Sequence, residues 1–154
     1  MGLDMYMTAR HSFYGCNITA TVCSEDYNGV KRENKIDNVR CVETEVGYWR
    51  KANAIHKWFV DNVQDGEDDC KQYYVSENDL NALELACRKV LASKGTEQEK
   101  EVAMKILPPC EGFFFGGTEI DEYYFTDLED TLKIIERARK ALLEKGDIYY
   151  SSSW

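Results

Sequence analysis

Residues 45–60 read EVGYWRKANAIHKWFV, and this stretch predicts a helix over residues 47–64. The helix would end before Gly66, because glycine suits the position that follows a helix. One face of the helix collects the apolar side chains Ala52, Ile55, Phe59 and Val63. That spacing matches a period of 3.6 residues and predicts a helix that packs on the core of a folded domain.

The neighbouring face of the same predicted helix is polar and aromatic. It presents Trp49, Asn53 and His56, with Arg50 beside them. In a pocket wall, the indole would stack on a ligand, the amide and imidazole would hold a polar group, and the guanidinium would meet a phosphate or carboxylate. In a structural role, the same side chains would pack, satisfy backbone groups and pair with an acid. The sequence leaves both interpretations open.

The segments before this helix are typical of strands. Alternating apolar and polar residues predict a first strand over residues 3–14, and β-branched residues predict a second over residues 17–23. Residues 39–43 are a further short candidate strand. The polar stretch 24–38 contains an Asn-Gly turn dipeptide, so we expect a mobile loop there.

The segments after the helix predict one short strand and two helices. Tyrosines and a valine at residues 73–75 favour an extended piece. A capping box at Ser76 and Asp79 opens a long helix, and a second box at Thr96 and Glu99 opens a shorter one.

The last third of the chain completes the predicted fold. Aromatic residues on both sides of a Gly-Gly pair predict a hairpin or a strand-loop-strand over residues 112–125. A capping box that starts at Thr126 opens a helix over residues 127–145, and residues 148–150 predict a final strand. The expected fold class is therefore α+β: a single domain over residues 1–154, with a mainly antiparallel sheet packed with about four helices.

The turn at residues 116–119 is a second candidate pocket wall. Its two glycines would let the backbone approach a ligand closely, but no Lys followed by Ser or Thr stands at the spacing of a phosphate-binding loop. The alternative is an ordinary hairpin turn. The candidate ligand-binding residues are Trp49, Arg50, Asn53, His56, Gly116, Gly117 and Glu119.

Composition excludes some classes of function. The chain has 154 residues and a formal net charge of −9, whereas general binding of DNA or RNA needs a basic surface. An acidic surface leaves room for a basic protein partner. Neither a signal peptide nor an apolar run of membrane-spanning length is evident, which predicts a cytoplasmic protein. The six cysteines lack zinc-ligand spacing, so we expect reduced thiols, no metal and no cofactor.

Catalytic motifs are sparse in this sequence. Only His11 and His56 can supply an imidazole base, and neither serine nor cysteine stands in a nucleophile motif. We therefore expect a binding protein. The alternative is a small hydrolase or nucleotide-modifying enzyme that uses His56 with a carboxylate.

Four segments resemble a family of small, uncharacterised bacteriophage and prophage proteins. They are MGLDMY at residues 1–6, VGYWRKANAIHKWFV at 46–60, GFFFG at 112–116, and the pattern YYxxxW at 149–154. The resemblance covers most of the chain outside residues 15–42 and implies a phage protein in the host bacterial cytoplasm. Small phage proteins without enzyme motifs often act on host defence, an association at family level. The expected role is binding of a host defence protein or a small nucleotide-like ligand, away from membranes, with a homo-oligomer as an open alternative.

Overall fold

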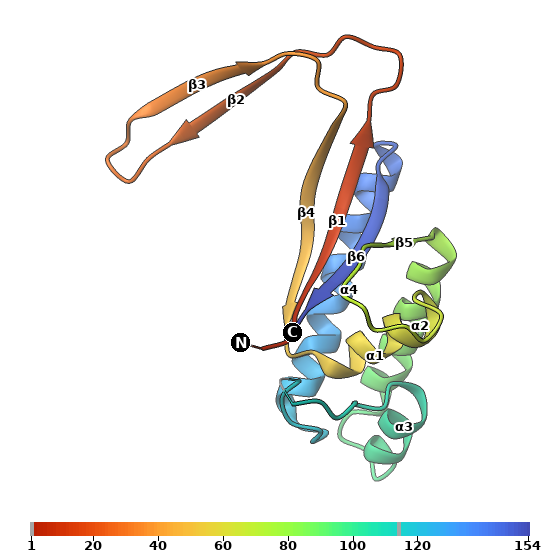
Figure 1. The fold of residues 1–154 in the computed structure, drawn as a ribbon. Helices are drawn as coiled ribbons and strands as arrows, with labels where there is room; N and C mark the ends of the chain where they lie inside the picture. Colours follow the sequence, from red (N-terminus) through yellow and green to blue (C-terminus); the bar gives the residue numbers. More distant parts are fainter. Residues whose placement is uncertain (1, 114) are drawn as a thin grey trace.

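The computed structural model describes residues 2–113 and 115–154, and it has the predicted α+β fold (Figure 1). Over these residues the strands are β1 (Asp4–Ser12), β2 (Ala20–Glu25), β3 (Lys31–Ile36), β4 (Cys41–Arg50), β5 (Tyr73–Val75) and β6 (Asp147–Ser153). The helices are α1 (Asn53–Asn62), α2 (Glu77–Ser93), α3 (Glu99–Ile106) and α4 (Glu122–Leu143). The strands predicted at residues 3–14, 73–75 and 148–150 are confirmed as β1, β5 and β6.

Four strands form an antiparallel sheet in the order β4-β1-β6-β5, and α4 lies along it. Helix α4 contacts β4, β1 and β6, and α2 packs against α4 (Figure 1). The sequence of β1 accounts for this arrangement, because Met5, Met7 and Ala9 alternate with more exposed residues and are fully buried. Burying each methionine stabilises the fold by about 1.5–3 kcal/mol.

The helix predicted over residues 47–64 begins later than expected. Gly47 lies in β4 beside β1, and α1 begins only at Asn53. A side chain at Gly47 would overlap Ile134 of α4, so close packing between sheet and helix requires glycine at this position. Lys51 then adopts a φ of 61°, which turns the chain between the strand and the helix.

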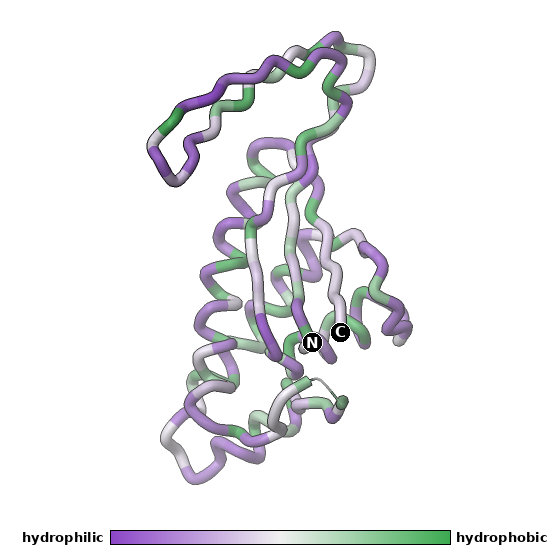
Figure 2. Tube along the Cα trace, turned by 60° about the vertical axis from the view of Figure 1, so that its left-hand side comes forward, coloured by the Kyte–Doolittle hydropathy of each residue, from purple (hydrophilic) through white to green (hydrophobic). Residues whose placement is uncertain are grey.

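The segment between β1 and β4 forms a hairpin, called the arm here and defined as residues 13–40. Strands β2 and β3 pair antiparallel with each other, and the arm extends away from the rest of the molecule (Figures 1 and 2). The segment predicted as a mobile loop over residues 24–38 contains a strand that the sequence did not indicate, because residues 31–36 form β3. The turn dipeptide does act as predicted: Gly29 has a φ of 76°, and its N–H donates to the Asp26 carbonyl at 2.9 Å.

The hairpin predicted over residues 112–125 is wrong, and residue 114 within it lies outside the described residues. The Asp121 carboxylate accepts a hydrogen bond at 3.0 Å from the N–H three residues later, so α4 begins at Glu122. The aromatic residues after this cap therefore belong to the first turn of a helix, where Tyr124 and Phe125 are buried and Tyr123 is exposed. The cap predicted at Thr126 is also wrong, because the Thr126 hydroxyl donates to the Glu122 carbonyl inside the helix.

The other two predicted capping boxes have different outcomes. The box at Ser76 and Asp79 is confirmed: Ser76 Oγ accepts from the Asp79 N–H, and the Asp79 carboxylate accepts from the Ser76 N–H. The box at Thr96 and Glu99 is not formed, since Thr96 Oγ1 donates to the Ser93 carbonyl at 2.7 Å. In the part of the chain that the structure describes, the helices are too short or too polar to span a membrane.

Candidate functional site

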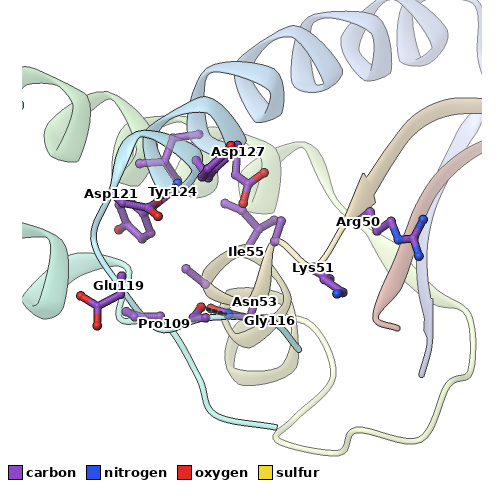
Figure 3. Close-up of a pocket in the computed structure, with 15 residues that line it drawn as sticks. Arg50, Lys51, Asn53, Ile55, Pro109, Gly116, Glu119, Asp121, Tyr124 and Asp127 are labelled. Atoms are coloured by element: carbon purple, nitrogen blue, oxygen red, sulfur yellow. Dashed lines mark hydrogen bonds between the residues drawn. The ribbon is translucent and has the colours of Figure 1, made fainter. Parts of the chain in front are cut away.

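A pocket of about 360 Å³ opens where the β4–α1 connection meets the start of α4 (Figure 3). Its third wall is the segment between α3 and α4, which contributes Pro109, Gly116, Gly117 and Glu119. Pockets that bind small molecules usually measure about 300–1,000 Å³, so the volume fits a small ligand. Of the seven predicted ligand-binding residues, the pocket brings five together: Arg50, Asn53, Gly116, Gly117 and Glu119.

Two cations border the pocket on the side of the β4–α1 connection. Arg50 ends β4 and Lys51 follows it, and both side chains are exposed. Neither side chain forms a hydrogen bond or an ion pair with another described residue. The backbone of Lys51 is left-handed, with a φ of 61°, a conformation that is uncommon for residues other than glycine. It turns the chain from β4 into α1 at the edge of the pocket. Both cations are therefore available to an anionic group.

An acidic and aromatic surface from α4 lines another side of the same pocket. Figure 3 shows Asp127 directed toward Ile55, with Asp121 and Tyr124 beside it. Burial, together with the smaller effects of the neighbouring acids Asp130 and Asp121, raises the pKa of the Asp127 carboxyl to about 7. The Asp127 carboxylate has no hydrogen-bond or ion-pair partner among the described residues. It is available to a ligand group that donates hydrogen bonds.

The Asn53 side chain positions one wall of the pocket. Its Nδ2 donates to the carbonyl of Phe115 at 3.1 Å and to the carbonyl of Gly117 at 2.8 Å. Gly116, between these two carbonyls, has a φ of 89°, and an added Cβ would lie 3.2 Å from Lys51 Cβ. Gly116 thus allows the loop to pack on Lys51, and Asn53 fixes the loop rather than pointing freely at a ligand.

The structure places Trp49 outside the pocket, in the hydrophobic core. Its indole is 3% exposed, and Nε1 donates to Thr131 Oγ1 at 2.9 Å. The ring contacts Phe59 and Tyr150 edge-on. Because residues alternate along a strand, Trp49 faces the core whereas Arg50 faces outward.

His56 also lies outside the pocket lining, at the centre of a buried polar chain. Nδ1 lies 2.8 Å from the Tyr150 hydroxyl, and Nε2 lies 3.0 Å from Asp68 Oδ2. The indole N–H of Trp154 donates to the other Asp68 oxygen at 3.1 Å. The imidazole is 1% exposed and stacks edge-on with Phe115. These contacts join α1 to β6, to the loop before β5 and to the loop that Asn53 holds.

Several residues of the pocket escaped the sequence analysis. Lys51, Tyr123 and Asp127 line it, yet the predicted helix boundaries placed Lys51 inside a helix and Tyr123 in a hairpin. One pattern could have indicated Asp127: it follows a buried tyrosine by three residues and precedes Leu128 of the buried stripe of α4. A carboxylate beside such a stripe has few ways to be solvated.

Comparison with known proteins adds no family to this geometry. No protein-family model matches the chain, and no curated protein and no solved structure matches it.

Proposed function

We propose that this chain is a phage accessory protein that binds a small nucleotide-like ligand and thereby counters a host defence. The phage setting comes from the resemblance of the sequence segments, and the ligand class comes from the chemistry of the pocket. A nucleotide combines an anionic phosphate, a flat ring and ring or exocyclic N–H donors in one small molecule. The pocket offers a complementary group for each of these.

The observation that supports the proposal best is the separation of charge across the pocket. Arg50 and Lys51 lie to one side, and the Asp127 carboxylate lies on α4 (Figure 3). A phosphate would pair with the two cations through charge-assisted hydrogen bonds. The Asp127 carboxylate would accept N–H groups from the edge of a base. The Tyr123 ring, which is 81% exposed, supplies a surface on which a base can stack.

Binding without conversion fits the placement of the histidine. Both ring nitrogens of His56 have partners, and the imidazole is buried outside the pocket lining. The described lining residues include no Ser, Thr, Cys or His. The protein is therefore proposed to act in stoichiometric amounts, by holding its ligand.

The test is a calorimetric titration with a panel of nucleoside monophosphates and cyclic mononucleotides. At least one is expected to bind in a one-to-one ratio and to be recovered intact after heat denaturation of the protein. Arg50→Ala should weaken binding about tenfold to a hundredfold, the effect of losing one charge-assisted hydrogen bond. The matched control is Arg137→Ala, an exposed arginine of α4 outside the pocket.

Two results would contradict the proposal. One is the absence of binding by every nucleotide at millimolar concentration. The other is product in large excess over the protein, which would indicate an enzyme. Equal loss of affinity in Arg50→Ala and Arg137→Ala would show that net charge, rather than the pocket, attracts the ligand.

A further inference from the structure

Among the described residues, the two strands of the arm form a sheet of their own that is joined to no other strand. Strands β2 and β3 pair with each other, and every residue of β3 is exposed. Figure 1 shows both strands extending beyond the sheet that carries the core. Tyr27 at the tip is fully exposed, and Val22 and Ile36 are each about half exposed. An isolated two-stranded hairpin is only marginally stable in water, so the arm lacks the packing that usually supports such an element.

The two free edges of the arm differ in chemistry. Four of the six residues of β3 are charged, and three of these are the cations Lys31, Arg32 and Lys35. Charged residues, lysine above all, protect an edge strand from pairing with another strand. In β2 only the last residue, Glu25, is charged, and the rest are small or β-branched. Hence the β2 edge is open to pairing and the β3 edge is protected.

The edges of the central sheet are less suited to a partner strand. At one edge, β4 carries Glu43, Glu45 and Arg50. At the other edge, β5 is only three residues long. Among the described strands, β2 therefore offers the longest uncharged edge.

The charge of the arm also differs from that of the remaining chain. Residues 13–40 contain four acidic and four basic side chains, so the arm is neutral and the rest of the chain holds the whole net charge of −9. The part of the chain outside the arm, residues 1–12 and 41–154, is called the body here. Two bodies of such negative charge repel each other. The arms extend from the bodies and can meet without that repulsion.

We propose that two copies of this chain associate through their arms, with the β2 edges pairing antiparallel about a two-fold axis. The product is a continuous four-stranded sheet with β3 of each copy at its outside. A two-fold axis brings the same surface of both copies together, so the β2 edge of one copy meets the β2 edge of the other in antiparallel orientation. When residues 21–25 of the two β2 strands pair with each other, Cys23 stands opposite Cys23 of the second copy.

The hydrogen bonds of the hairpin identify the groups that point to the partner. The Asp26 N–H donates to the Val30 carbonyl at 3.1 Å, which fixes this pair as hydrogen-bonded. Hydrogen-bonded and non-bonded pairs alternate in an antiparallel ladder. Cys23 and its cross-strand neighbour Glu33 are therefore a non-bonded pair, and their backbone N–H groups point outward at opposite edges.

This geometry supplies a matched pair of variants. Cys23→Pro removes an N–H from the β2 edge, and Glu33→Pro removes one from the β3 edge at the same level of the hairpin, without deleting a bond inside it. Sedimentation velocity at about 100 μM is expected to give a dimer for the wild type and for Glu33→Pro. For Cys23→Pro the dissociation constant should rise at least about tenfold. Thermal unfolding of the body should be alike in both variants, because the arm packs on neither α4 nor the central sheet.

A second measurement tests the register of the arms. Mild oxidation should cross-link wild-type dimers through Cys23, whereas Cys23→Ser should remain dimeric but not cross-link. Cys16→Ser, another exposed cysteine of the arm, should cross-link like the wild type. A wild-type chain that stays monomeric up to millimolar concentration would overturn the proposal, and so would equal loss of the dimer in both proline variants. If the chain stays monomeric but its arm binds a different protein, the proposed pairing of two copies is wrong.

Discussion

At the scale of single residues, the Asp127 carboxyl is the group whose environment is least suited to its charge. Burial raises its pKa to about 7, with smaller effects of Asp130 and Asp121. An unfolded aspartate titrates near pH 4, so the folded protein binds a proton between about pH 4 and 7 that the unfolded chain has lost. Folding stability attributable to this group therefore falls as the pH rises through that range.

Asp127→Asn should remove this pH-dependent cost. We expect the free energy of unfolding to rise by about 1–2 kcal/mol at pH 8, a value that allows for solvent screening at this partly exposed group. At pH 4, where the native carboxyl is protonated, the effect should be small. Chemical denaturation of both proteins at the two pH values checks this, and a gain that is equal at both would contradict the assignment of the pKa.

Truncation of His56 should lower the stability of the fold, whereas truncation of Arg50 should leave it nearly unchanged. His56→Ala leaves the buried Tyr150 hydroxyl and an Asp68 oxygen without their partner, which is expected to cost about 1–3 kcal/mol of stability. Arg50→Ala removes an exposed side chain without an ion pair, so stability should change by less than about 0.5 kcal/mol. Urea denaturation measures both. A near-neutral His56→Ala would show that the buried chain is not structural.

At the scale of elements, the contact between β4 and α4 depends on Gly47. A Cβ at this position would overlap the Ile134 side chain. Gly47→Ala is expected to destabilise the fold by about 1–3 kcal/mol, the usual effect of overpacking. Ile134→Ala removes all three side-chain atoms that the new Cβ would overlap. In the double variant the combined loss of stability should therefore be smaller than the sum of the two single losses, as thermal unfolding can show. Additive losses would mean that the two positions do not compete for space.

The same region shows which elements the sequence can predict. Alternation in β1 and the capping box of α2 are local patterns, and both predictions hold. Residues 47–50 fit a helical period equally well, but pairing with β1 and the space left by α4 make them a strand. Those partners are distant in the sequence, and tertiary contacts override local propensity. The polar β3 was missed because its pattern lacks buried residues.

At the scale of the whole molecule, the candidate site is assembled from three segments that are far apart in the chain. The sequence alone indicates Arg50, Asn53 and the loop at residues 116–119, since glycines and polar groups near aromatic residues are visible in a short stretch of chain. It could not find that Trp49 and His56 turn inward, because that depends on where β4 ends. Nor could it place Asp127 in the same pocket as the two cations, which requires the packing of α1 on α4.

The charge separation across the pocket is tested most directly by the pH dependence of binding. Cyclic mononucleotides suit this test because their phosphodiester does not titrate between pH 6 and 8. If the ionised Asp127 carboxylate accepts hydrogen bonds from the base, calorimetry should show wild-type affinity about tenfold higher at pH 8 than at pH 6, given its pKa of about 7. In Asp127→Asn that dependence should vanish. Wild-type affinity that is equal at both pH values, or a variant that keeps the full dependence, would contradict the proposed site.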